Sequence, residues 1–178
     1  AGAIGRGEIR LTGLDPQSAQ GDRAVVEILR DMGADIRWEG DALVSRASRL
    51  HGLRVDCAQI PDLVPILAVA MAAAEGESRI TGAARLRIKE SDRLSAMAAA
   101  LTAAGADVSE LPDGLIIRGG KRLHAAKIEG CNDHRIVMAM TMVSEIADGE
   151  LTITDAEATA KSAPAFWREF EHLGGLAR

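Results

Sequence analysis

Aromatic side chains are almost absent from this sequence, which has two Trp, two Phe and no Tyr among its 178 residues. So few rings argue against a surface on which nucleic-acid bases stack. The formal net charge of −5 argues against the basic surface that general nucleic-acid binding requires. Hydrophobic residues nevertheless make up 47% of the chain. The core is therefore expected to be aliphatic, built from Ala, Leu, Ile, Val and Met.

Cysteine is also scarce, because only Cys57 and Cys131 are present. Two cysteines do not make a disulfide framework, and no paired Cys/His spacing indicates zinc. We therefore expect a reducing, cytoplasmic compartment, with both cysteines small, buried and not nucleophilic. The longest apolar stretch, residues 63–74, is too short to span a bilayer, so no membrane association is expected.

The first seven residues are rich in glycine and lack the apolar segment of a secretion signal. They resemble the end of a flexible linker. No initiator methionine opens the chain, so we expect it to be a piece of a longer protein. The remaining residues are enough for one domain with a buried core.

Hydrophobic periodicity and turn residues predict alternating strands and helices. The expected strands are residues 8–12, 35–38, 42–45, 51–55, 78–81, 106–109, 115–118 and 151–154. The expected helices are residues 22–32, the apolar run from 63 to 74, and residues 94–104, 136–147 and 162–173. Gly33 and Gly105 each follow a helix, where glycine commonly ends one.

The same order of elements occurs twice. Met32-Gly33-Ala34-Asp35 matches Ala104-Gly105-Ala106-Asp107, and Glu75-Gly76-Glu77 matches Asp148-Gly149-Glu150. The period is roughly seventy residues, longer than that of short solenoid repeats. Each copy has the order βαββ-βα, so the sequence predicts one α/β domain with internal pseudosymmetry.

One stretch, residues 87–94, places two cations and two carboxylates within five positions at the start of a helix: Lys89, Glu90, Asp92 and Arg93. The unpaired amides of a helix's first turn bind anions, and lysine and arginine add positive charge there. The alternative interpretation is a capped, solvated helix start.

The repeat makes the charged residues at helix starts informative. Asp62 in one copy matches Arg135 in the other, and Lys89 matches Lys161. Scaffold positions repeat, whereas these positions carry a different charge or a different neighbourhood in each copy. We therefore predict that six side chains converge on one site: Asp62, Lys89, Glu90, Arg93, Arg135 and Lys161. Such a set suits an anionic substrate that undergoes proton transfer.

Taken together, the charged motifs resemble the 3-phosphoshikimate 1-carboxyvinyltransferase (EPSP synthase) family. They are Lys89-Glu90-Ser91-Asp92-Arg93-Leu94, Asn132-Asp133-His134-Arg135, Ala160-Lys161-Ser162 with Pro164 and Phe166, Ile60-Pro61-Asp62, and Gln20-Gly21-Asp22. The resemblance covers essentially the whole chain.

The resemblance implies an inside-out α/β barrel architecture, in which two similar domains of three βαβαββ units close over phosphoenolpyruvate and shikimate-3-phosphate. Residues 1–7 would be the end of the interdomain linker, and residues 8–178 most of the C-terminal enolpyruvyl transferase domain. The implied partner is the N-terminal domain, which this chain does not contain, so the chain alone is expected to be inactive. The family needs no metal or organic cofactor and acts in the shikimate pathway of aromatic amino acid biosynthesis.

The resemblance also implies roles for individual residues. Asp62 would take the proton of the substrate 5-hydroxyl, Lys89 would contact that hydroxyl and the transferred group, and Glu90 would handle the methylene proton. The remaining cations, Arg93, Arg135 and Lys161, would hold the carboxylate and phosphate of phosphoenolpyruvate.

Other residues have a structural interpretation that competes with a functional one. Asp62 alone is typical of a helix cap. His134 is expected to be a structural histidine bonded to backbone beside the site, and Asp133 to orient Arg135 or a backbone amide. Met138, Met140 and Met142 are expected in the core. Gly119-Gly120-Lys121 is expected to be a turn, since it lacks the spacing of a phosphate loop.

One position departs from the family pattern. Some relatives have a substrate-binding asparagine four residues before the motif lysine, and here Arg85 stands there, so that role is not assigned. Two alternative functions remain: a binding module for small phosphorylated carboxylates without turnover, and an enolpyruvyl transferase for UDP-N-acetylglucosamine. The carboxylate beside the motif lysine speaks against a pure anion binder, and the motifs speak against the second alternative.

Overall fold

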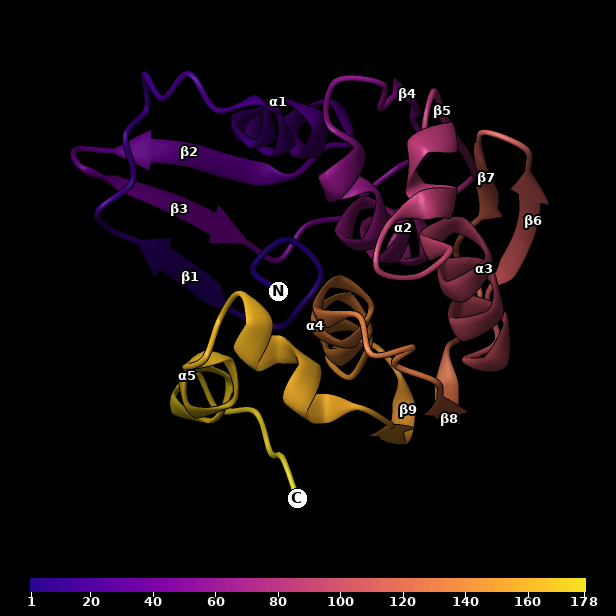
Figure 1. The fold of residues 1–178 in the computed structure, drawn as a ribbon. Helices are drawn as coiled ribbons and strands as arrows, with labels where there is room; N and C mark the ends of the chain where they lie inside the picture. The colour runs from indigo at the N-terminus through magenta and orange to yellow at the C-terminus, as the bar shows by residue number, and fades with distance from the viewer.

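The computed structural model describes residues 1–178 and confirms a chain of alternating strands and helices (Figure 1). The strands are β1 (Glu8–Leu11), β2 (Asp35–Glu39), β3 (Ala42–Arg46), β4 (Arg54–Asp56), β5 (Glu77–Thr81), β6 (Asp107–Leu111), β7 (Gly114–Arg118), β8 (His124–Ile128) and β9 (Asp148–Ile153). The α-helices are α1 (Ala24–Asp31), α2 (Val64–Ala73), α3 (Arg93–Ala103), α4 (His134–Val143) and α5 (Phe166–His172). Short 3-10 helices are η1 (Gly21–Arg23), η2 (Pro61–Leu63), η3 (Ala84–Ile88) and η4 (Ala156–Lys161).

The predicted pseudosymmetry is confirmed by the sheets. One sheet has the order β1-β3-β2, and a second has the order β4-β5-β7-β6, so β5, β7 and β6 repeat the arrangement of β1, β3 and β2. The parallel pair β4–β5 recurs as the parallel pair β8–β9. The stretch from β4 to β7 is thus one complete βαβαββ unit, flanked by parts of two similar units.

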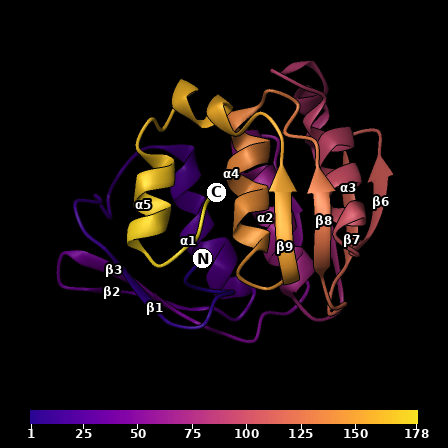
Figure 2. The same ribbon diagram turned by 90° about the horizontal axis from the view of Figure 1, so that it is seen from below.

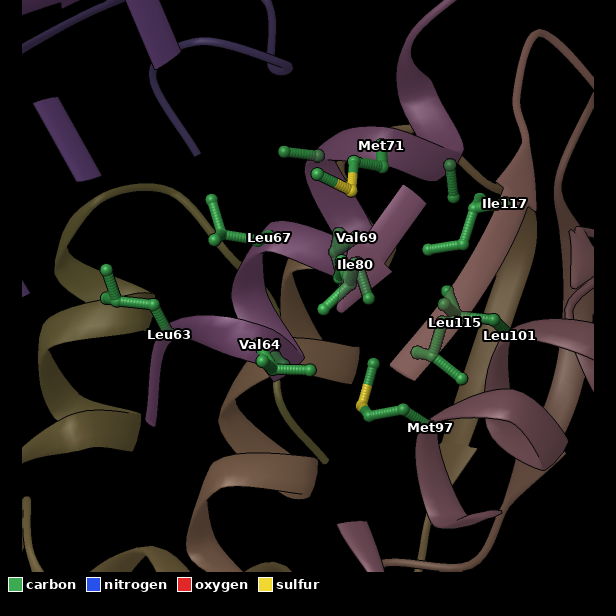
Figure 3. Packing of buried hydrophobic residues seen from close by; sticks show 14 of the residues in the cluster. Leu63, Val64, Leu67, Val69, Met71, Ile80, Met97, Leu101, Leu115 and Ile117 are labelled. Carbon is green, nitrogen blue, oxygen red and sulfur yellow. The ribbon is translucent and has the colours of Figure 1, made fainter. Parts of the chain in front are cut away.

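The core lies around α2, which is buried on nearly all sides. Helices α2 and α4 lie near the middle of the molecule, with the sheets outside them (Figures 1 and 2). Figure 3 shows Val69 of α2 beside Ile80 of β5, next to aliphatic side chains of β7 and α3 that belong to the same core cluster. The expected aliphatic core is therefore confirmed. No helix combines the length and the apolar character that crossing a membrane requires.

Three element predictions were wrong. The expected last helix, 162–173, is shorter: Pro164 is tolerated only at or before a helix start, so α5 begins at Phe166. The expected strand 51–55 is reduced to β4, because the Leu53 amide donates to the Ser78 hydroxyl rather than to a backbone carbonyl of a neighbouring strand, and His51 makes only an isolated bridge. The helix expected over 136–147 ends at Val143.

Strand β8 was missed, since His-Ala-Ala-Lys-Ile has weak strand propensity. Its conformation depends on parallel pairing with β9.

Residues 1–7, expected to resemble a linker, pack on the domain: Ala3 is buried and its carbonyl accepts from the Ser48 amide at 3.0 Å.

The hairpin β6–β7 approaches β5 too closely for a side chain at Gly114. A methyl group there would overlap the carbonyl oxygen of Ile80. We expect Gly114→Ala to lower the free energy of unfolding by about 2 kcal/mol, the cost of overpacking. Urea denaturation of the chain measures this. Gly7→Ala, which adds a methyl group in open space, is the control, and an equal effect of the two substitutions would contradict the packing argument.

Candidate active site

Three helix N-termini bring charged side chains together. Asp62 lies in η2 directly before α2, Arg93 opens α3, and Arg135 lies in the first turn of α4. The three helices pack against one another. Their first-turn amides and positive dipole ends therefore lie on one side of the core, which favours anions.

The Asp62 carboxylate joins cations from three segments. Its Oδ1 accepts from Arg93 Nη1 at 3.0 Å and lies 3.8 Å from Lys89 Nζ. Its Oδ2 accepts from Arg135 Nη2 at 3.0 Å, and the Asp62 carbonyl accepts from Arg135 Nη1 at 3.1 Å. The interpretation of Asp62 as a helix cap is wrong, since η2 has no side-chain cap.

Arg93 is the buried centre of the cluster, with 1% of its side chain exposed. Its Nε donates to Asp133 Oδ2 at 2.7 Å, and its Nη2 donates to Glu90 Oε2 at 2.6 Å and to Asp133 Oδ1 at 3.2 Å. With the bond to Asp62, three carboxylates surround one guanidinium. A buried charge is tolerated only when it is paired and hydrogen-bonded in this way.

Asp133 joins the two charged motifs of the sequence. It is fully buried, and besides Arg93 it accepts from Ser91 Oγ at 2.9 Å and from the Arg135 amide at 2.9 Å. The prediction that it orients a backbone amide is confirmed. Burial raises the pKa of Asp133, but the bonds from Arg93 and the Arg135 amide outweigh it, so the pKa lies below its ordinary value.

Lys161, at the end of η4, reaches the loop before α4. Its Nζ donates to the Asn132 carbonyl at 2.6 Å and to Asn132 Oδ1 at 2.7 Å. Asn132 has a positive φ of 49°, and its amide donates to Asp155 Oδ2 at 2.9 Å. Five of the six predicted residues are thus linked by ion pairs, and Lys161 joins them through the loop that carries Asp133.

Two expectations beside the site were wrong. His134 has a buried Nδ1 with no hydrogen-bond partner, 4.0 Å from Asp133 Oδ1, rather than a bond to backbone. Cys131 is exposed rather than buried, and its backbone is left-handed, with φ of 53°. Cys57 is buried as expected, and burial raises the pKa of its thiol to about 11.

Of the three methionines expected in the core, Met140 is fully buried and the other two are half-buried. Sequence reasoning also left Ser91, Asn132 and Arg87 without a role. Each lies inside or next to a motif, but only their contacts show what they hold.

The arrangement combines proton carriers with binding groups. Lys89, Arg93 and Arg135 are paired with the three carboxylates, whereas Lys161 donates only to Asn132, so one cation of the site remains for added negative charge. Lys89, Glu90 and Arg135 keep about a third or more of their side chains exposed. No group of three or more His, Cys, Asp or Glu is arranged to hold a metal ion.

The site is open to solvent. Asp62, Lys89 and Arg135 each keep about a third of their side chains exposed. A substrate bound here would remain partly in solvent unless another body covered it.

Comparison with known proteins agrees with this geometry. The family model described as EPSP synthase (3-phosphoshikimate 1-carboxyvinyltransferase) matches residues 1–170. The 3-phosphoshikimate 1-carboxyvinyltransferase of Clostridium novyi is 44% identical over 176 residues, which are 99% of this chain and 40% of that protein.

Solved structures give the same result. EPSP synthase from Acinetobacter baumannii superimposes with a TM-score of 0.79 at 31% identity, over 99% of this chain and 44% of that one. The enolpyruvyl transferase NikO from Streptomyces tendae has a TM-score of 0.81 at 20% identity, over 99% of this chain and 41% of that one, and shows the fold alone. This chain spans about 40% of the length of its curated relatives.

We expect Asp133→Asn to lower the free energy of unfolding by about 3 kcal/mol at neutral pH, because it breaks a buried ion pair. The folded-state pKa of Asp133 is lowered. The ionised Asp133 therefore contributes to the free energy of unfolding at pH values above its unfolded-state pKa of about 4. This contribution is lost as the pH falls through its folded-state pKa.

The difference in the free energy of unfolding between wild type and Asp133→Asn should accordingly become smaller as the pH is lowered from neutral. Urea denaturation at a series of pH values, down to the lowest pH at which the chain is folded, measures this. Asp148→Asn, which removes an exposed pair with Arg122, is the control and should change stability little. A difference that stays constant with pH would show that the charge of Asp133 is not the cause.

Proposed function

Because this chain belongs to the EPSP synthase family, we propose that it supplies the C-terminal part of an enzyme that transfers the enolpyruvyl group of phosphoenolpyruvate to the 5-hydroxyl of shikimate-3-phosphate. The products would be EPSP and phosphate, in the shikimate pathway of aromatic amino acid biosynthesis. The observation that carries the proposal is the Asp62 carboxylate, held among Lys89, Arg93 and Arg135 where three helices begin.

The reaction needs both a proton source and a proton acceptor. Protonation of the methylene carbon makes the neighbouring carbon of phosphoenolpyruvate electrophilic, and the 5-hydroxyl attacks it as a base removes the hydroxyl proton. The tetrahedral adduct then loses phosphate and one methyl proton, which restores the double bond. In our proposal Asp62 accepts the hydroxyl proton, Lys89 contacts that oxygen and the transferred group, and Glu90 carries the methylene proton.

The cations would hold the two anionic groups of phosphoenolpyruvate. Arg135 and Lys161 are accessible, and a guanidinium binds carboxylate or phosphate in a bidentate manner. Arg93 already donates four hydrogen bonds to Asp62, Glu90 and Asp133, so one N–H remains for a ligand. We therefore propose that Arg93 mainly holds the three carboxylates in place and contacts the substrate through a single N–H group.

The open face of the site supports a two-domain enzyme. We propose that residues 1–7 lead out of an interdomain linker, that residues 8–178 form the C-terminal domain, and that the missing N-terminal domain covers the substrates. The exposed, unpaired thiol of Cys131 fits a reducing, cytoplasmic compartment. The competing function is a module that binds small phosphorylated carboxylates without turnover.

Complementation distinguishes these functions. We expect no phosphate release when the chain alone is mixed with phosphoenolpyruvate and shikimate-3-phosphate, because the site is open on one side. Adding the separately expressed N-terminal part of the same enzyme should restore turnover. If the mixture stays inactive although the chain is folded and binds phosphoenolpyruvate, the binding module is the correct function.

In the complemented enzyme, Lys89→Met and Asp62→Ala should each lower kcat by about 10²- to 10⁴-fold, the usual contribution of a proton-transfer group. Steady-state phosphate release measures this. Lys121→Met, which removes an exposed lysine paired with Asp107, is the matched control and should leave kcat unchanged. Near-normal turnover in either site variant would refute the role given to that residue.

A further inference from the structure

Arg87 lies in η3, two residues before Lys89, and its guanidinium donates several hydrogen bonds to other segments of the chain. Its Nε donates to the Pro112 carbonyl at 2.8 Å, and its Nη2 donates to the Leu111 carbonyl at 2.7 Å. Its Nη1 donates to Glu110 Oε1 at 2.8 Å and to Asp92 Oδ2 at 2.9 Å. Four of its five N–H groups are therefore used.

The bond between Arg87 and Asp92 closes a short loop. The four residues between them, 88–91, include Lys89 and Glu90, so the pair joins the two ends of the segment that carries the proposed proton carriers. Asp92 is fixed in turn, since it caps α3 through the Ser95 amide at 3.1 Å.

The other contacts of Arg87 fasten this loop to the hairpin β6–β7. Glu110 accepts from Ser95 Oγ at 2.9 Å as well as from Arg87. The hairpin turn is itself held, because the Asp113 side chain and carbonyl accept from the amides of Gly82 and Ala83 at 3.0 and 2.7 Å. Hydrogen bonding to Glu110, and also to Asp92, raises the pKa of the Arg87 guanidinium and keeps it charged.

The internal repeat shows that the contacts of Arg87 are not part of the scaffold that the two copies share. Lys161 matches Lys89, so the position that matches Arg87 is Thr159. Thr159 donates only to the Ala156 carbonyl, one turn away in its own 3-10 helix. These contacts of Arg87 with Asp92 and the hairpin β6–β7, called the clamp below, therefore exist only in the copy whose loop carries both a lysine and a carboxylate.

We propose that Arg87 is a positioning residue that holds Lys89 and Glu90 at the substrate by tying both ends of their loop to the hairpin β6–β7. Arg87 does not touch the reacting groups, and it acts through Asp92 and the loop. Displacing a reactive group by about 1 Å costs on the order of 10²-fold in rate. The rate measurement rests on the function proposed above.

The test uses the complemented enzyme and the single-turnover rate constant with enzyme in excess, which does not depend on the fraction that is folded. Arg87→Ala should lower this rate constant by about 10- to 100-fold, with little change in the dissociation constant of phosphoenolpyruvate. Arg87→Lys, which keeps the charge but not the fork of donors, should recover part of the rate. Arg118→Ala, which removes exposed ion pairs of the same hairpin, should leave the rate unchanged.

A double-mutant cycle tests the path through Asp92. Asp92→Asn retains a helix-capping side chain but loses the ion pair. If Arg87 acts through Asp92, the double variant should be little slower than Arg87→Ala alone, whereas Asp92→Asn and Arg118→Ala should combine additively. A normal single-turnover rate in Arg87→Ala, or full additivity with Asp92→Asn, would overturn the proposal.

Hydrogen exchange separates failure of this proposal from failure of the proposed function. The amides of Ser95 and Ala96, which donate to Asp92, should exchange faster in Arg87→Ala than in Arg118→Ala, whether or not the enzyme turns over. An inactive wild-type mixture with this exchange pattern would refute the function and support the clamp. Unchanged exchange in Arg87→Ala would refute the clamp, whatever the turnover.

Discussion

The buried guanidinium of Arg93 is the constraint on which the site depends. It holds Asp62, Glu90 and Asp133, which come from three separate parts of the chain. Without this cation, three carboxylates would repel one another at the meeting point of three helix starts. Because the cation is enclosed, each carboxylate has one position rather than many, and the exposed Lys89 and Arg135 are placed relative to them.

Pseudosymmetry explains how such a cluster arises from a repetitive chain. The repeated positions are apolar residues and glycines that build equivalent sheets, as in β1-β3-β2 and β5-β7-β6. The positions that differ are those at helix starts, where a side chain does not disturb the sheets. One scaffold thus presents an anion, Asp62, in one copy and a cation, Arg135, in the next, and packing brings them together.

The sequence was sufficient to predict the α/β class, the repeat and the five charged residues that ion pairs join, because hydrophobic period, glycine position and charge are local properties. It did not predict β8, whose conformation depends on pairing with β9, or the late start of α5. It also could not show that Arg93 is enclosed rather than free, since enclosure depends on Asp133, forty residues away. Contacts between distant segments, such as those of Arg87 with the hairpin β6–β7, carry no signal in a single sequence.

The left-handed turn before α4 gives the molecule a natural place for a spectroscopic probe. Its Cys131 is exposed, whereas Cys57 is buried. A thiol-reactive fluorophore would therefore attach to one position without mutagenesis. That position adjoins Asn132, the residue that holds Lys161. A dye at this turn would report in real time whether the lysine leaves its resting contact when an anion arrives.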